Sequence, residues 1–244
     1  GRLAQTLPES LKSLENGELL VSLGSCYWLF NETAKNQNLQ SYNFKRPSFR
    51  FLVGDQIYND RFSRSVIWDS TFTAPDTFNN YRYQWNDNSF QNFFTAAPNA
   101  MLADDHEFWD DYPTEKIFQI WSRFTNENKK KQIVKDCISG FETYQLPMNP
   151  GSQKSFRLDF KELSFFVLDT RISRDRFTQF TNAEDRSKFY NWITNLEKPG
   201  VFVLSNSLID ETFSKRNAKA GIDDHTLADY GSDYFFIWEK LAKA

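Results

Sequence analysis

Met101-Leu-Ala-Asp-Asp-His-Glu-Phe-Trp-Asp-Asp-Tyr-Pro113 begins as a short apolar run and turns at once into a dense polar cluster. Five carboxylates this close together repel one another unless positive charge lies among them. A solvated acidic loop after a strand is the simpler interpretation of such a composition. A bound cation is the alternative, because hard cations take oxygen ligands and His binds several transition metals. The rest of the chain has to decide between the two. The polar members of the cluster are Asp104, Asp105, His106, Glu107, Asp110 and Asp111.

The composition is that of an ordinary soluble globular protein, and one domain is the simplest organisation. The 244 residues are 40% hydrophobic and 25% charged, which is usual for a folded domain. The formal net charge is −3, from 29 Lys and Arg against 32 Asp and Glu, so no polybasic surface is offered to nucleic acid. No apolar run approaches the roughly 20 residues that span a bilayer. The two cysteines cannot form a disulfide framework.

Apolar runs of strand length alternate with longer polar or helical stretches, which predicts a layered α/β domain. Most of these runs are followed directly by polar side chains that could bind a ligand. In open sheets, ligands bind at the carboxyl ends of the strands, so we expect one composite site at this edge. The runs are Leu19–Leu23, Phe49–Val53, Asn99–Ala103, Leu163–Leu168 and Val201–Leu204.

The residues that follow these runs have both structural and functional interpretations. Cys26 is either a packed thiol or a metal ligand, and packing is the preferred interpretation for Cys26 taken alone. Asp55 comes after Gly54, which allows a sharp turn, and is well placed for a site. Tyr58 is otherwise a half-buried aromatic residue with a hydrogen-bonded hydroxyl. In the Asp169–Arg171 segment we expect the acid and the base to pair and hold a loop beneath the site.

The segment Asn59–Asn99 is long for a connection between strands. It is either a lid facing the substrate or a pair of helices packed on the sheet, and Phe90, Phe93 and Phe94 indicate one helical face. The second Asp-Asp-His, Asp223–His225, is interpreted as a flexible loop because no strand precedes it. Other helices are predicted at Leu7–Asn16, over Ile117–Phe124, over Ile133–Ile138 with Cys137 in the core, after a capping box at Thr181–Glu184, and over Tyr234–Leu241.

Four motifs occur in an order that resembles the PhoD-type alkaline phosphatases, over about residues 19–241. These phosphatases belong to the calcineurin-like, purple-acid-phosphatase-related metallophosphoesterases. The resemblance implies a four-layered α/β/β/α sandwich with a binuclear metal site between strand ends. It also implies hydrolysis of phosphomonoesters or phosphodiesters, with Fe(III) and Ca(II) as the metals and other divalent ions as alternatives. The motifs are Gly24-Ser25-Cys26, Gly54-Asp55-Gln56-Ile57-Tyr58, Asp104-Asp105-His106-Glu107 and Leu168-Asp169-Thr170-Arg171.

The resemblance also implies a role for each matching residue. Cys26 as thiolate and Tyr58 as phenolate would bind the iron, and these ligands suit a ferric ion better than magnesium. Asp55 would bridge the metals, and Asp105 would bind the second one. His106 would face the substrate, stabilising the phosphate or protonating the leaving oxygen. The remaining acids of the cluster would either bind calcium or hydrogen-bond to the metal ligands, and the resemblance does not choose between these roles. They are Glu107, Asp110 and Asp111.

The chain departs from the family in one respect. The family closes its site with a later strand of the Gly-Asp-x-His type, whereas Gly54-Asp55 is the only Gly-Asp here and the sequence ends at Ala244. We therefore expect residues 1–244 to form one PhoD-like metallophosphatase domain whose C-terminal part lies outside this sequence. His225 alone cannot replace the missing set of ligands.

Metal-dependent hydrolysis of phosphate esters is the leading hypothesis for function. The alternative is a catalytically inactive relative that acts as a binding or interaction module, motivated by the missing motif. Glycoside hydrolysis by paired carboxylates is a third hypothesis that rests only on the abundance of Asp. Many relatives are exported, which favours an extracytoplasmic location. The sequence does not predict the substrate-binding residues, the physiological substrate or the oligomeric state.

Overall fold

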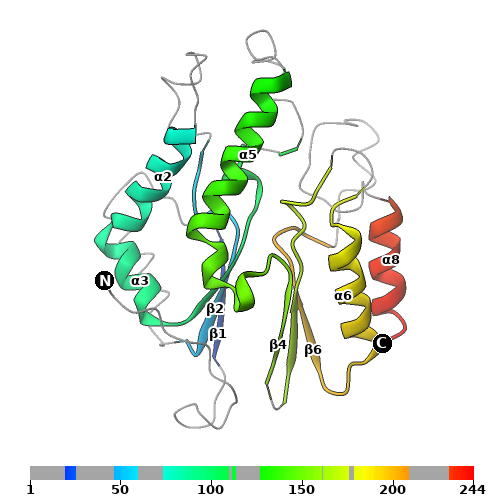
Figure 1. The fold of residues 1–244 in the computed structure, drawn as a ribbon. Helices are drawn as coiled ribbons and strands as arrows, with labels where there is room; N and C mark the ends of the chain where they lie inside the picture. Colours follow the sequence, from blue (N-terminus) through cyan, green and yellow to red (C-terminus); the bar gives the residue numbers. More distant parts are fainter. Residues whose placement is uncertain are drawn as a thin grey trace, which may run out of the picture.

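The computed structural model describes residues 20–25, 47–59, 74–109, 112–113, 127–160, 162–175, 179–208 and 231–244. Within these ranges, two three-stranded sheets lie face to face and helices cover their outer sides (Figure 1). Several sequence predictions lie outside the described residues: the helices at Leu7–Asn16 and Ile117–Phe124, Cys26, Asp110, Asp111 and the loop Asp223–His225.

The first sheet consists of β1 (Val21–Gly24), β2 (Phe49–Val53) and β3 (Asn99–Leu102), in that order and all parallel. β2 and β3 fall within runs that the sequence predicted, and β1 overlaps its run, Leu19–Leu23, ending one residue beyond it. Because the strands are parallel, the chain leaves each of them at the same edge of the sheet. The segments that follow β2 and β3 are therefore neighbours in space.

The second sheet consists of β4 (Phe156–Asp159), β5 (Ser164–Val167) and β6 (Gly200–Val203). β5 and β6 are parallel, whereas β4 pairs antiparallel with β5. β5 lies in a predicted run, and β6 begins one residue before its run, Val201–Leu204. The sequence did not predict β4, because its residues, Phe-Arg-Leu-Asp, alternate between apolar and polar and so do not form an apolar run.

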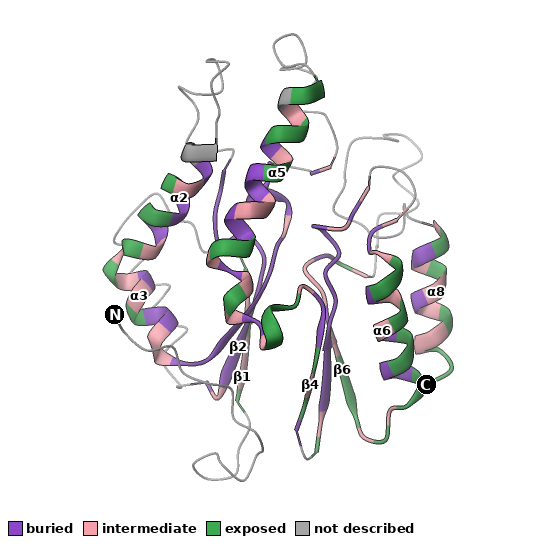
Figure 2. Ribbon diagram, in the orientation of Figure 1, coloured by how far each residue is buried: buried purple, intermediate pink, exposed green. Residues whose placement is uncertain are grey.

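The strand periodicity explains how the two sheets pack. In β2, Phe49, Phe51 and Val53 point to one face, where they contact the second sheet, while Leu52 points to the other. The second sheet contributes Phe165 among others, and its ring lies 5.4 Å from that of Phe49. Figure 2 shows the resulting band of buried residues along both sheets. This contact forms the central core.

The helices cover the two outer faces, which completes the predicted α/β/β/α order of layers (Figure 1). On the first side, the chain between β2 and β3 forms α2 (Ala74–Asn86) and α3 (Asn88–Ala96). Phe90, Phe93 and Phe94 of α3 pack on the outer face of the sheet. For its described part, residues 74–96, the excursion is therefore the predicted pair of helices.

The other helices follow the apolar spacing in the sequence. α5 (Glu127–Tyr144) buries Cys137 completely, as expected for a core residue. On the second side, α6 (Ala183–Thr194) and α8 (Gly231–Leu241) cover β5 and β6. Three short 3₁₀ helices complete the described elements: η4 (Asp105–Glu107), η5 (Leu146–Met148) and η6 (Pro150–Ser152).

The start of α6 corrects one prediction. The capping box was placed with Thr181 as the N-terminal cap, but the cap is Asn182, whose side chain accepts the backbone N–H of Asp185 at 2.8 Å. Asn and Thr both serve as caps, and Thr181 is buried instead. The predicted box is therefore wrong by one residue, although the helix itself is confirmed.

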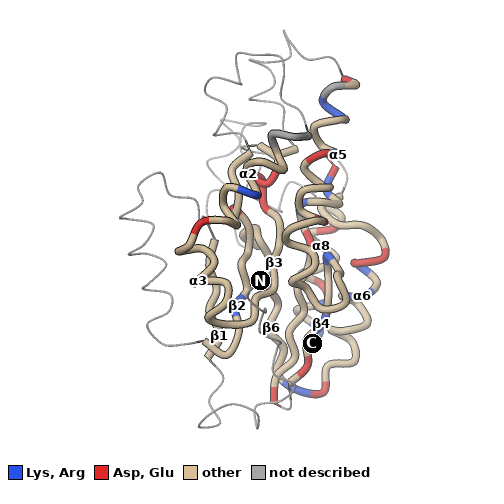
Figure 3. Tube along the Cα trace, turned by 60° about the vertical axis from the view of Figure 1, so that its left-hand side comes forward, with Lys and Arg blue, Asp and Glu red and all other residues tan. Residues whose placement is uncertain are grey.

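The described surface carries charges of both signs. Lys, Arg, Asp and Glu are interspersed along the helices in Figure 3. None of the helices in the described ranges is long and apolar enough to cross a membrane.

Candidate metal centre

The carboxyl ends of β2 and β3 bring together two carboxylates and an imidazole. Asp55 follows β2, while Asp105 and His106 lie in η4 just after β3. Each offers one ligand atom, and these atoms all lie within 4.8 Å of one another. All three residues are buried. The composite site expected from the sequence is therefore present at the expected edge.

Backbone geometry at the end of β2 allows the two loops to approach this closely. Gly54 has φ of 109° and Asp55 has φ of 58°, so the chain turns sharply through the left-handed region. A Cβ on Gly54 would lie 2.2 Å from the Cβ of Asp104 in the neighbouring loop. Only glycine fits this contact, which places the carboxylates of the two loops side by side.

Tyr58 joins the same group of side chains. Its hydroxyl donates to Oδ2 of Asp55 at 3.2 Å. Its ring lies against His106, with 4.0 Å between the ring centroids. A phenol, a carboxylate and an imidazole from two separate segments are thus in direct contact.

Glu107, the last residue of η4, is completely buried. Its carboxylate accepts hydrogen bonds from the backbone N–H groups of Asp55, Gln56 and Asp104 and from the side chain of Gln145. Burial, together with the nearby negative charge of Asp55, raises the pKa of Glu107 to about 8, while the N–H donors oppose this rise. Both oxygens of Glu107 face donors in the protein, which favours support of the ligands over calcium binding among the two predicted roles.

Asn59 fixes η4 from the other side. Its backbone N–H donates to the carbonyl of His106 at 3.0 Å, and its Nδ2 donates to the carbonyl of Glu107 at 2.7 Å. Asn80 of α2 in turn donates to Oδ1 of Asn59 at 3.1 Å. Sequence reasoning missed Asn59, and its position directly after the Gly54–Tyr58 motif was the only available signal.

The predicted ion pair between Asp169 and Arg171 is wrong, because Arg171 pairs with Asp104 instead. The Arg171 guanidinium binds Asp104, with Nε at 2.8 Å and an Nη at 2.7 Å from Oδ1. Asp169 instead accepts the backbone N–H groups of Arg171, Ile172 and Ser173. The reason is that the turn which follows Asp169 presents three backbone N–H groups directly to its carboxylate. The expected structural role is retained, since Arg171 links the end of β5 to the loop after β3.

At Asp104 and Asp169, burial raises the pKa and the hydrogen-bonding or charged partners lower it. Burial raises the pKa of Asp104, and the charge of Arg171 counteracts this. Burial likewise raises the pKa of Asp169, against the backbone donors that favour its ionised form. Asn206, after β6, also donates to Asp104, at 3.3 Å. Asp104 therefore serves as the junction between the loops of the two sheets.

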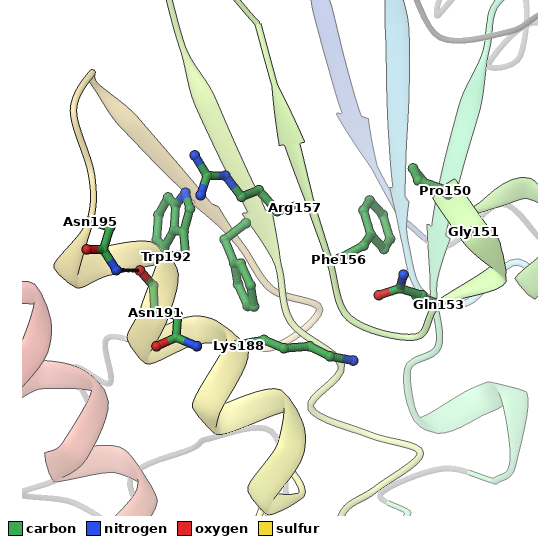
Figure 4. A pocket seen from close by; sticks show the side chains of 10 residues that line it. Pro150, Gly151, Gln153, Phe156, Arg157, Lys188, Asn191, Trp192 and Asn195 are labelled. Carbon is green, nitrogen blue, oxygen red and sulfur yellow. Dashed lines mark hydrogen bonds between the residues drawn. The ribbon is translucent and has the colours of Figure 1, made fainter.

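A pocket elsewhere on the second sheet has a different character. Its volume is about 560 Å³, and it lies between η6, β4 and α6 (Figure 4). Arg157 and Lys188 line it together with Trp192. Arg157 is paired with Asp159 at 2.6 Å, and Lys188 with Glu184 at 2.8 Å. The two cations are thus already neutralised, and the pocket shares no residue with the cluster at the strand ends.

Four of the five residues expected at the site lie together. The structure brings Asp55, Tyr58, Asp105 and His106 into one neighbourhood. Cys26, the fifth, lies outside the described residues.

The layered fold and the acidic and imidazole groups at the strand ends agree with the expected resemblance, and the comparisons with known proteins identify the family. The family model "PhoD-like phosphatase" matches residues 27–198. The chain therefore belongs to the PhoD-like phosphatase family.

A solved structure, described as "Structure of PhoD", has the same fold. It aligns with a TM-score of 0.64 and 15% sequence identity, over 92% of this chain and 48% of that chain. At this identity the match supports the fold, and the chain spans about half the length of the solved protein. No curated protein matches the chain.

Proposed function

We propose that the protein hydrolyses phosphate esters at a metal centre held by Asp55 and Asp105, with Tyr58 and Cys26 as further ligands and with His106 facing the substrate. The observation that carries this proposal is the convergence of Asp55, Asp105 and His106 at the strand ends, with ligand atoms within 4.8 Å of one another. Membership of the PhoD-like phosphatase family supports the reaction class.

The donor set fits metal ions. Carboxylate oxygens bind hard cations, and imidazole and phenolate bind transition metals. The described residues place carboxylates next to each other with an imidazole in reach, an arrangement that a cation would stabilise. When bound, metal ions would supply positive charge to the phosphate oxygens and acidify a water molecule for attack on phosphorus. Fe(III) and Ca(II) are the metals we propose, with other divalent ions as alternatives.

Each residue has a distinct part in this proposal. Asp55 would bridge two ions; its hydrogen bond with Tyr58 and the distance of under 4.8 Å to the ligand atoms of η4 support this role. Tyr58 would bind the ferric ion together with Cys26, and Asp105 would bind the second ion. His106 would hydrogen-bond to the phosphate or protonate the leaving oxygen, as an imidazole can do near neutral pH. Phosphomonoesters and phosphodiesters are both candidate substrates.

The test combines metal analysis with hydrolysis of an aryl phosphate monoester and diester. We expect bound metal, hydrolysis that a chelator abolishes, and recovery when metal is returned. An iron-containing sample should also show a visible charge-transfer band that disappears in Tyr58→Phe and in Cys26→Ser. Full activity in metal-free protein would refute the proposal. Tight metal binding without turnover would favour the inactive binding module instead.

A further inference from the structure

One buried carboxylate holds both of the loops that carry the candidate ligands. Oε2 of Glu107 accepts the backbone N–H of Asp55 at 3.0 Å and that of Asp104 at 2.7 Å. Oε1 accepts the backbone N–H of Gln56 at 2.9 Å and Nε2 of Gln145 at 3.1 Å. The loop after β2 and the loop after β3 therefore meet on a single side chain.

Only a carboxylate of this length satisfies the arrangement. A carboxyl group places an oxygen opposite each set of N–H donors, whereas the amide of Gln would place an NH2 group, which only donates, opposite one of them. The bond to Asp55 is important because this residue has φ of 58°, a conformation that a non-glycine residue keeps only when its surroundings hold it there. Glu107 therefore fixes the backbone from which the Asp55 side chain reaches Asp105 and His106.

The helical layer orients Glu107 in turn. Gln145, which follows α5, is fully buried and donates through Nε2 to Oε1 of Gln56 at 2.7 Å as well as to Glu107. Its Oε1 accepts the hydroxyl of Tyr81 in α2 at 2.7 Å. The amide oxygen of Gln56 can only accept, so it keeps the Nε2 end of the Gln145 amide toward Glu107, and the Tyr81 hydroxyl donates to the other end. The chain of hydrogen bonds thus runs from α2 to the metal-binding loops.

We propose that Glu107 is the positioning residue of the metal centre: its buried carboxylate sets the separation of Asp55 from Asp105 and His106, and Gln145, which accepts a hydrogen bond from Tyr81, holds that carboxylate in place. Glu107 does not touch substrate or metal in this role. The inference rests on the proposed function for its effect on metal binding, but the loop geometry that it describes can be tested separately.

The experiment compares Glu107→Gln with the matched control Asp233→Asn. Asp233 is also a buried carboxylate: it accepts the backbone N–H of Phe180 at 3.2 Å and pairs with Arg186, but it lies in α8 on the far helical layer. Titration with Co²⁺ measures affinity, and the visible absorption of the bound ion reports its coordination. We expect Glu107→Gln to weaken Co²⁺ binding by about 10–100-fold and to change the absorption spectrum, with both unchanged in Asp233→Asn.

The result that overturns the proposal is a folded Glu107→Gln protein that binds Co²⁺ with the affinity and spectrum of the parent. If Glu107→Gln does not fold, Tyr81→Phe replaces it, because this variant keeps the carboxylate and loses only the hydroxyl that donates to Gln145. It should weaken Co²⁺ binding several-fold, and unchanged affinity would overturn the proposal equally.

Hydrogen exchange separates failure of this inference from failure of the proposed function. If the parent protein binds no metal, the proposed function fails, whereas the positioning role still predicts faster exchange of the Asp55, Gln56 and Asp104 amides in Glu107→Gln. Exchange at these three amides that matches Asp233→Asn would refute the positioning role as well.

Discussion

The loops that follow the two sheets both bury carboxylates, but they surround them differently. After β2 and β3, Asp55 and Asp105 approach each other and an imidazole. After β5, Asp169 accepts backbone N–H groups of its own turn, and the neighbouring Arg171 binds Asp104. Asp55 and Asp105 therefore face further metal-binding groups, whereas Asp169 faces hydrogen-bond donors.

This difference teaches that burial alone does not identify a functional acid. Burial raises the pKa of Asp169 as it does that of Glu107, yet Asp169 only closes a turn. The informative property is the chemistry of the groups that each carboxylate faces. Removing a carboxylate after the first sheet should therefore impair function, whereas disturbing the pairs after the second should impair stability.

The largest expected effect is the loss of hydrolysis in Asp55→Asn. The amide keeps the size of the side chain but cannot bridge two cations as a carboxylate does, so activity should fall by about 10³-fold or more, beyond the roughly 10²–10³-fold effect of removing one electrostatic stabiliser. Activity toward an aryl phosphate ester and the amount of bound metal measure the change. Asp169→Asn is the matched control, and equal losses of activity in the two folded variants would contradict the comparison.

Arg171→Met should have the next largest effect, on stability. The guanidinium is completely buried, and its loss would leave Asp104 with a buried charge that lacks its ionic partner. Breaking a buried pair typically costs about 3–5 kcal/mol, and since Asp104 is half-buried we expect about 3 kcal/mol. Chemical denaturation measures the free energy of unfolding. The double variant Arg171→Met, Asp104→Leu removes the charge as well, so it should recover part of the loss if this reason is correct.

The sequence predicted the layers because they follow from local patterns. Phe49–Val53 alternates toward two apolar environments, and Phe90, Phe93 and Phe94 form one helical face, so each segment carries its own signal. β4 contains no continuous apolar run. Its antiparallel pairing with β5 depends on the turn between the two strands.

The candidate site was predicted in part for the same reason. Asp55, Asp105 and His106 come directly after strand-like runs, and parallel strands end at the same edge of a sheet. The supporting contacts connect residues far apart along the chain, as Gln145 with Gln56 and Arg171 with Asp104. Nothing in the sequence near Gln145 or Arg171 identifies these partners, because they depend on how the layers pack.

The smallest of these effects is a dependence of stability on pH in the metal-free protein, and it again distinguishes the two regions. The pKa of Glu107 is raised to about 8 by burial and by the charge of Asp55, so the folded state binds a proton more tightly than the unfolded chain does. A raised pKa stabilises the fold fully below the unfolded value near 4.5. That stabilisation is lost as the pH rises through the folded value of about 8.

We therefore expect the free energy of unfolding of metal-free protein to fall as the pH rises from 5 to 8. Denaturation curves across this range measure the slope. Metal should reduce it, because positive charge beside Asp55 favours the ionised form of Glu107. Raised pKa values at Asp104 and Asp169 act in the same direction, so variants separate the regions. Glu107→Gln should flatten the slope more than Asp169→Asn does, and the opposite ranking would assign the raised pKa to the loops after the second sheet.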